Sequence, residues 1–213
     1  MGLLQSTLDY FLANQAVFWQ SARQHLALSS AAMAISLLVG LPLGIWIAGR
    51  VKLAQAVLNV FNSLRVIPSL AILFLALPSL GLGFTPALVA LTVLAFPPVI
   101  INTYAGMRGV DRAVVESAAG MGMTGWQILG QIEIPLPIPA IVTGIRIAAV
   151  EVISSATLAA FIGGGGLGDF ITRGFALYDV PIMLVGAIPV ALLALLSEAG
   201  WVLVLKAYRR AVA

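Results

Sequence analysis

The chain has 213 residues, of which 61% are hydrophobic and only 9% are charged. Soluble domains carry about 25% charged residues, so most of this surface must face lipid rather than water. Cysteine is absent and His25 is the one histidine, which excludes a disulfide framework and argues against a metal site or metal cofactor. The net charge of +3 comes without a dense basic cluster, so nucleic acid is not an expected partner.

Five stretches are apolar and long enough to cross a bilayer, which takes about 20 residues. The first 25 residues instead alternate apolar and polar side chains, a pattern that favours a helix lying in the membrane interface. The sequence therefore predicts an all-α integral membrane protein that forms a single domain over 1–213, with an interfacial segment at 1–25. The predicted spans are 26–48, 66–82, 86–105, 138–162 and 182–205.

Lysine and arginine are retained on the cytoplasmic side of membrane proteins and therefore indicate orientation. With five spans, one side receives Arg23 and Arg173, and the other side receives seven basic residues. We therefore expect the C-terminus and segment 111–135 in the cytoplasm, and the N-terminus and segment 163–181 outside. The seven are Arg50, Lys52, Arg108, Arg112, Lys206, Arg209 and Arg210.

Prolines interrupt the predicted spans, and each removes a backbone donor and tends to kink a helix. Two interpretations stay open. The kinks serve ordinary bundle packing, or they bend helices around a pathway that opens and closes. The prolines concerned are Pro42, Pro68, Pro78, Pro97, Pro98 and Pro189.

The polar segment 111–135 lies between two apolar spans. Asp111 is a good N-cap for a short helix that ends near Ala119, and Gly120 and Gly122 then permit a bend. We thus expect two short helices that meet at a glycine joint.

The second of these helices is predicted to begin at Thr124, which forms a capping box with Gln127, and to end before Pro135. The segment carries apolar residues of its own, which must bury against the underside of the bundle or against a cytoplasmic partner. A re-entrant or interfacial hairpin is the alternative.

The same segment resembles the signature of bacterial ATP-binding-cassette (ABC) importer permeases of the binding-protein-dependent, MetI-like superfamily. That signature is Glu-Ala-Ala, a glycine and a Leu-Pro-like pair at these spacings. Ser117 departs from the usual alanine, but both residues are small. The matching residues are Glu116, Ser117, Ala118, Gly122, Trp126, Ile134 and Pro135.

Further motifs along the chain are similar to one subgroup, the osmoprotectant permeases that import glycine betaine, choline, carnitine or proline betaine. These motifs are Ile67-Pro-Ser-Leu-Ala71, Asn102-Thr-Tyr104, Gly144-Ile-Arg146, Ala156-Thr-Leu-Ala159 and Ile162-Gly-Gly-Gly-Gly-Leu-Gly-Asp-Phe-Ile171.

The resemblance implies a multi-pass protein of the bacterial inner membrane that works with three partners. These are cytoplasmic ABC ATPase subunits, an extracytoplasmic solute-binding protein and a second permease subunit, identical or paralogous. Segment 111–135 would couple the bundle to the ATPase. The chain has no phosphate-binding Gly-x-x-x-x-Gly-Lys loop, and its lysines are Lys52 and Lys206 alone, so ATP hydrolysis is assigned to the partner and not to this chain.

Four charged residues fall in or near apolar stretches, where charge usually faces the bundle interior or a water-filled path. Arg65 is expected to reach the cytoplasmic interface with its long side chain. Arg146 and Glu198 are expected to find structural partners. Glu151 either pairs structurally or lines the translocation path, where its carboxylate would suit a cationic solute. Ser154, Ser155 and Thr157 would continue that polar lining.

A glycine-rich run follows the fourth predicted span, and residues 167–177 can form a short helix after it. By resemblance, this is the outer gate that meets the binding protein, although a plain flexible connector is the alternative. The gate residues are Gly163, Gly164, Gly165, Gly166, Gly168 and Asp169.

Two rival functions come from other classes. Gly166-Leu-Gly-Asp169 and Tyr178-Asp179 imitate the two motifs of intramembrane aspartyl proteases, but they lie in one outer segment and in the wrong order. An ion-coupled secondary transporter with Glu151 as the coupling carboxylate is the other rival. It lacks an evident internal repeat and leaves the polar segment unexplained.

Overall fold

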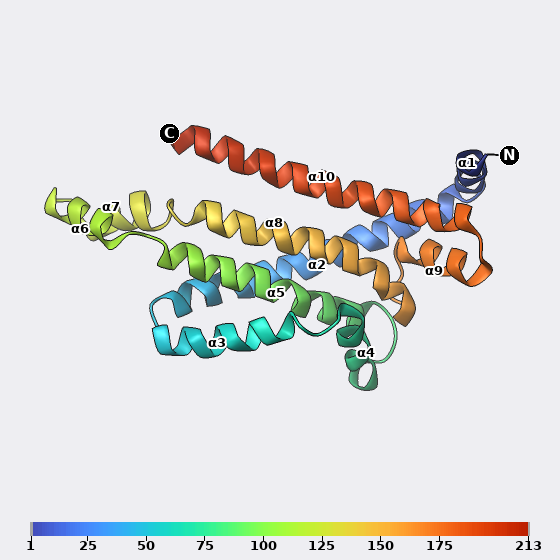
Figure 1. Cartoon of the computed structure of the whole chain (residues 1–213), viewed down its shortest axis with the longest axis horizontal. Helices are drawn as coiled ribbons and strands as arrows, with labels where there is room; N and C mark the ends of the chain where they lie inside the picture. The colour runs from blue at the N-terminus through green and yellow to red at the C-terminus, as the bar shows by residue number, and fades with distance from the viewer. Residues whose placement is uncertain (1, 213) are drawn as a thin grey trace.

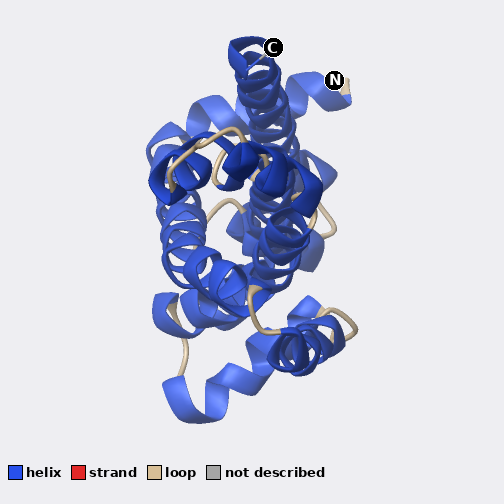
Figure 2. Cartoon of the chain, turned by 90° about the vertical axis from the view of Figure 1, so that its left-hand side faces the viewer, coloured by secondary structure: helices blue, strands red, loops and turns tan. Residues whose placement is uncertain are grey.

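The computed structural model describes residues 2–212, and Met1 and Ala213 lie outside them. Within that range the chain is made of helices and loops (Figure 2). The helices are α1 (Leu3–Ala13), α2 (Gln15–Ala48), α3 (Val51–Leu64), α4 (Ser69–Leu80), α5 (Phe84–Arg108), α6 (Arg112–Gly120), α7 (Gly125–Ile128), the π-helical η1 (Leu129–Glu133), α8 (Ile138–Ser155), the 3-10 helix η2 (Ala156–Ile162), α9 (Gly168–Leu177) and α10 (Val180–Val212).

Four helical stretches are long and apolar enough to cross a membrane: α2, α5, α8 with η2, and α10. They run side by side along the long axis of the molecule (Figure 1). The expected spans 86–105, 138–162 and 182–205 each fall within one of these stretches. Helix α5 lies at the centre, because Ala87, Leu91 and Val99 are fully buried there between α2, α4 and α8.

The expected span at 66–82 is not one continuous helix. Helix α4 has 12 residues and is about 18 Å long, which is too short to cross a hydrocarbon core of about 30 Å. Helix α3, which we did not expect, precedes it, and the two helices meet at a bend of 97°. Pro68 stands at this bend as the residue before α4, and proline disfavours helical geometry in the residue before it. A fifth span exists only if α3 and α4 together count as one broken span.

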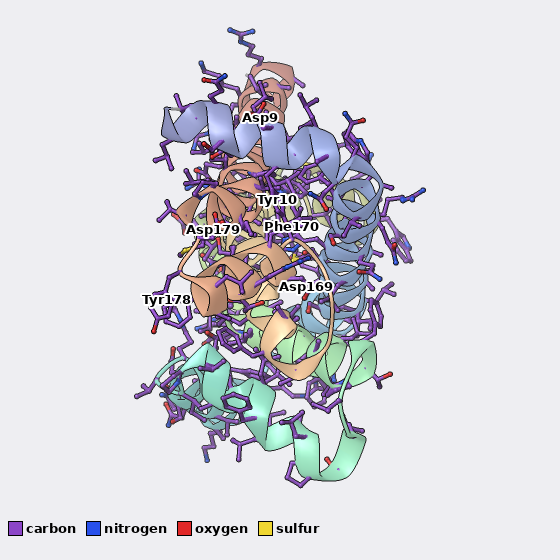
Figure 3. All side chains as sticks on the ribbon, turned by 90° about the vertical axis from the view of Figure 1, so that its right-hand side faces the viewer. Asp9, Tyr10, Asp169, Phe170, Tyr178 and Asp179 are labelled. Atoms are coloured by element: carbon purple, nitrogen blue, oxygen red, sulfur yellow. The ribbon has the colours of Figure 1, made fainter. Side chains whose placement is uncertain are left out.

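The boundary at residue 25 is also corrected. Helix α2 begins at Gln15 and has 34 residues, a length of about 51 Å that exceeds the hydrocarbon core. Residues 15–25 therefore continue the first long helix instead of lying apart from it. Only α1 is separate, and it lies across one end of the molecule, against α10 (Figures 1 and 3).

The two ends of the bundle carry different segments. Helices α6 and α7 lie at one end, which is also the end toward which the C-terminus runs (Figure 1). Helix α1, helix α9 and the α4–α5 turn lie at the other end, where the amide of Gly83 donates to the carbonyl of Ile162 over 2.7 Å. The opposition expected between segments 111–135 and 163–181 is therefore present in the fold.

Small residues allow the long helices to approach closely, as is common in membrane bundles. A Cβ added at Gly144 of α8 would lie 2.6 Å from both the carbonyl oxygen of Pro98 and the Cβ of Asn102 on α5. The prolines inside α2, α5 and α10 do not break those helices. Among residues 2–212, one pair of helices, α3 and α4, is sharply bent within a candidate span.

Candidate functional site

The polar segment begins with the expected cap. The Asp111 side chain accepts a hydrogen bond from the amide of Ala113 over 2.9 Å and starts α6. After α6, Gly122 adopts a φ of +85°, a left-handed conformation that favours glycine. The glycine joint predicted from sequence is therefore a real turn, and Gly122 is the residue that makes it.

The second short helix also starts as expected. The amide of Thr124 donates to the Gln127 side chain over 2.8 Å, and the Gln127 amide donates back to the Thr124 hydroxyl over 3.4 Å. This capping box opens α7, which then widens into η1. The π-helical turn was not expected. It ends at Glu133, and a short connection then leads to α8 at Ile138.

Most of the signature residues face outward. Glu116 and Ser117 are exposed, and the side chains of Trp126 and Ile134 are 83% and 53% exposed. Ala118 is the exception, because it is only 2% exposed and packs inside the segment. The small signature residues are therefore divided between the surface and the interior, and the large side chains of Trp126 and Ile134 remain uncovered.

A side chain that sequence reasoning missed anchors the end of this segment. The Tyr208 hydroxyl of α10 donates to the carbonyl of Pro135 over 2.7 Å. No local pattern could have indicated it, since the two residues are 73 positions apart. The bond links the polar segment directly to the last long helix.

At the opposite end, the glycine run has a defined conformation. Gly163, Gly165 and Gly166 adopt φ values of +70°, +73° and +97°. Gly164 is buried, and a Cβ there would lie 2.9 Å from the side chain of Ala159. Three left-handed residues and one close approach describe a packed turn rather than a loose connector.

His25 lies beneath this turn and was missed as a site residue. It is 1% exposed, and its Nε2 is 3.0 Å from the carbonyl oxygen of Ile153. A Cβ at Gly166 would lie 3.2 Å from the His25 Nδ1. The imidazole thus joins α2, the end of α8 and the glycine turn. A lone histidine in an apolar helix gives no sequence signal for this role.

The two aspartates of the protease-like motifs lie at this same end (Figure 3). Asp169 is exposed in the first turn of α9. Asp179 accepts a hydrogen bond from the amide of Ile182 over 3.2 Å at the start of α10. Neither residue lies inside a long span, so the arrangement does not fit two membrane-embedded catalytic carboxylates. Within the described residues, no group of three or more histidine, aspartate or glutamate side chains is placed to hold a metal ion.

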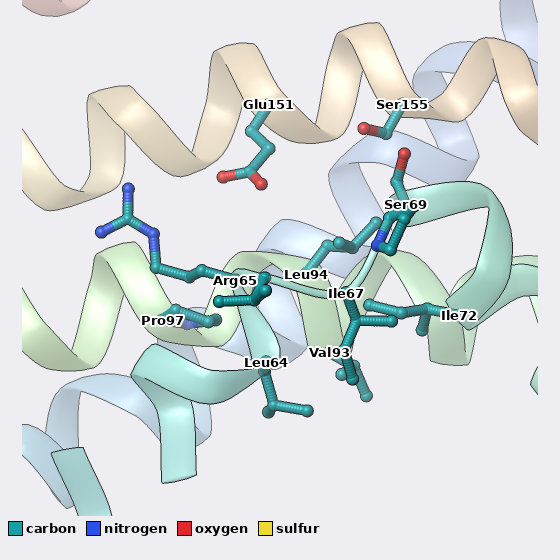
Figure 4. A pocket seen from close by; sticks show the side chains of 12 residues that line it. Leu64, Arg65, Ile67, Ser69, Ile72, Val93, Leu94, Pro97, Glu151 and Ser155 are labelled. Carbon is teal, nitrogen blue, oxygen red and sulfur yellow. The ribbon is translucent and has the colours of Figure 1, made fainter. Parts of the chain in front are cut away.

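Between the two ends, a cavity of about 230 Å³ lies at the α3–α4 bend (Figure 4). Its polar lining comes from Arg65, Ser69, Glu151 and Ser155. Of the four expected path residues, Glu151 and Ser155 therefore share this space. Ser154 and Thr157 are not among the lining residues, and the Thr157 hydroxyl donates to the Ser154 carbonyl over 2.7 Å.

Arg65 does not reach the end of the molecule, contrary to expectation. It follows the 14 residues of α3, which places it about 20 Å along the helix axis from Arg50. Its side chain lines the cavity from the end of α3, opposite Glu151 of α8 (Figure 4). Arg65 is thus an exposed residue that lines the cavity at the α3–α4 bend.

Arg146 and Glu198 find the structural partners expected of them in each other. The Arg146 Nε is 3.5 Å from a Glu198 carboxylate oxygen, an ion pair between α8 and α10. The two side chains are 30% and 42% exposed, so the pair lies on the flank of the bundle. It is separate from the cavity that Arg65 and Glu151 line.

The chain is similar to known transport proteins in sequence. Residues 40–210 match the family described as binding-protein-dependent transport system inner membrane component. The chain is 48% identical to the carnitine transport permease protein OpuCB of Listeria monocytogenes, over 82% of this chain and 80% of the relative. It is 39% identical to the osmoprotectant import permease protein OsmY of Salmonella typhimurium, over 90% and 82%.

Solved structures share the fold. A chain of the MetNI methionine ABC transporter in an inward-facing conformation superposes with a TM-score of 0.79 at 21% identity, over 91% of this chain and 97% of that one. A chain from an amino acid ABC transporter with histidines gives a TM-score of 0.72 at 20% identity, over 94% and 96%. At these identities the matches concern the overall fold alone.

Proposed function

Because this chain belongs to the family of binding-protein-dependent transport system inner membrane components, we propose that it is the permease subunit of an ATP-driven importer for osmoprotectants. The family makes the chain an integral inner-membrane transport component. The substrate class rests on one observation above all, the 48% identity to a carnitine transport permease over four fifths of both chains. Glycine betaine, carnitine, choline and proline betaine are the solutes to test.

The segment 111–135 is the part of the chain that we assign to the ATPase. Three properties support this assignment: it stands at one end of the bundle, it has a defined fold of its own, and it leaves Trp126 and Ile134 uncovered. Aromatic side chains such as that of Trp126 are enriched in protein interfaces. Glu116, Ser117 and Gly122 would lie in contact with the partner, while Ala118 holds the segment together from within.

This assignment sets the orientation. The end with α6, α7 and the C-terminus would face the cytoplasm, where ATP is available, and the end with α1 and α9 would face outward. The excess of lysine and arginine near the first end supports the same direction. Helix α1, which lies across the outer end with Leu4 and Leu8 exposed, would then rest in the membrane interface.

The outer turn and the central cavity would serve the solute. Segment 163–181 would receive a solute-binding protein, with the turn made by Gly163 to Gly166, Gly168 and Asp169 lying beside the contact. The cavity with Glu151 and Ser155 would form part of the path, and Ser154 and Thr157 would lie just outside it. A second permease subunit, identical or paralogous, would complete the pathway.

Reconstitution tests the proposal. The chain would be co-expressed with its ATPase and binding protein, placed in proteoliposomes, and assayed for uptake of labelled glycine betaine, carnitine and choline at high external salt. We expect uptake of at least one of these solutes that requires ATP, the ATPase and the binding protein together. Uptake by the chain alone, without ATP, would contradict the proposal and favour an ion-coupled transporter.

A further inference from the structure

The cavity at the α3–α4 bend holds two opposite charges that do not form a close pair. Ion pairs within 4.0 Å are limited, among the described residues, to Arg146 with Glu198. Arg65 and Glu151 therefore stand further apart, although both line the same space of about 230 Å³. Figure 4 shows the Glu151 carboxylate reaching down from α8 and the Arg65 side chain reaching up from the end of α3.

Glu151 lies within the membrane-spanning stretch of α8, and Arg65 is exposed in the single chain but lines the same cavity. Charges among apolar spans are costly unless something satisfies them. Direct contact between the two side chains would be the simplest way to reduce this energetic cost, yet they lie more than 4.0 Å apart across the cavity. A third group that carries both a positive and a negative charge would satisfy both at once. The start of α4 adds to the positive side, because residues 66–69 line the cavity and a helix N-terminus favours an anion.

We propose that this cavity is a transit site for a zwitterion, whose ammonium group faces Glu151 and whose carboxylate faces Arg65 and the first turn of α4. The inference rests on the proposed function and deepens it, since it separates solutes that carry a carboxylate from solutes that do not. Glycine betaine and carnitine carry both charges, whereas choline carries only the positive one.

The remaining lining explains why the site would release its solute. None of the 12 lining residues is aromatic, so the cation meets no aromatic cage of the kind that holds quaternary ammonium groups tightly. A transport path must bind its solute weakly enough to let it leave. One carboxylate, one guanidinium and two serine hydroxyls, from Ser69 and Ser155, meet that need.

The test compares solutes within one variant. Arg65→Gln, Arg65→Lys, Glu151→Gln and Glu151→Asp would be reconstituted with the ATPase and loaded binding protein, and initial uptake of glycine betaine and choline measured below saturation. Arg65→Gln should lower glycine betaine uptake about tenfold, as expected for a loss of about 1.4 kcal/mol. It should leave choline uptake within about twofold of wild type, which also reports that the variant folds and couples.

The other variants fix the interpretation. Glu151→Gln should lower uptake of both solutes, and the charge-preserving Glu151→Asp should retain much of that uptake. In the same way, Arg65→Lys should retain much of the glycine betaine uptake that Arg65→Gln loses. Equal losses of choline and glycine betaine uptake in Arg65→Gln would overturn the inference. So would unchanged uptake of both solutes by Glu151→Gln. A wild-type complex that imports choline but not glycine betaine would also overturn it. If wild type carries only carboxylate-bearing solutes, a loss in Arg65→Gln that Arg65→Lys does not rescue counts against it. A wild-type complex that imports no quaternary ammonium solute would instead refute the proposed function.

Discussion

Gly122→Ala tests whether the conformation of the polar segment matters for its partner. Gly122 has a φ of +85°, and a Cβ there would meet no atom within 4 Å. The substitution therefore introduces no steric clash with neighbours, and its cost is the backbone strain of a left-handed alanine, about 1–2 kcal/mol. The free segment can relax to another conformation, but docking in the observed form must then overcome that cost.

Such a cost corresponds to about 5- to 30-fold weaker binding of the ATPase. Gly120→Ala is the matched control. It lies two residues earlier, at the end of α6, also with open space around its Cβ, but in a helical conformation where alanine is favoured over glycine. The assay is the affinity of nanodisc-embedded permease for the purified ATPase. Equal affinity of Gly122→Ala and wild type, or an equal loss in Gly120→Ala, would show that the left-handed turn at Gly122 does not matter for docking.

Three further substitutions test contacts between the long helices and the contact of α10 with segment 111–135. Arg146→Met should destabilise the protein, because it leaves the Glu198 carboxylate of the membrane-spanning α10 without its partner. Adding Glu198→Met should recover part of the loss in a double-mutant cycle read by thermal unfolding in detergent. Gly144→Ala should lower the thermal midpoint through its clash with α5, whereas Gly130→Ala, with nothing within 4 Å, should not. Tyr208→Phe should cost about 1 kcal/mol and speed proteolysis of segment 111–135, and an unchanged rate would show that the hydrogen bond to that segment does not restrain it.

Local patterns predicted local structure well. Asp111, Thr124 and Gln127 cap the short helices as expected because a cap depends on residues two or three positions away. The long apolar spans were also recognisable, since length and hydropathy are properties of one stretch. Gly122 was identified as a joint for the same reason.

Features that depend on tertiary packing were not predictable. Helix α3 was missed because its polar residues, among them Lys52, Gln55 and Asn59, lower its hydropathy below that of a span, although its apolar residues share a helical face. Arg65 was misplaced for the same reason, because its depth follows from the length of α3. The contacts of His25 with residues more than a hundred positions away required the fold itself.

Cross-linking can show whether segment 111–135 meets the ATPase on the cytoplasmic side. The natural chain has no cysteine, so single cysteines can be introduced without removing any. Ser117→Cys places a thiol on the exposed face of α6, and Phe175→Cys, at a side chain that is 70% exposed on α9, places one at the opposite end. With a short thiol-reactive cross-linker in the assembled complex, we predict that Ser117→Cys joins the permease to the ATPase and that Phe175→Cys does not. Cross-linking of the ATPase through Phe175→Cys but not through Ser117→Cys would contradict the account.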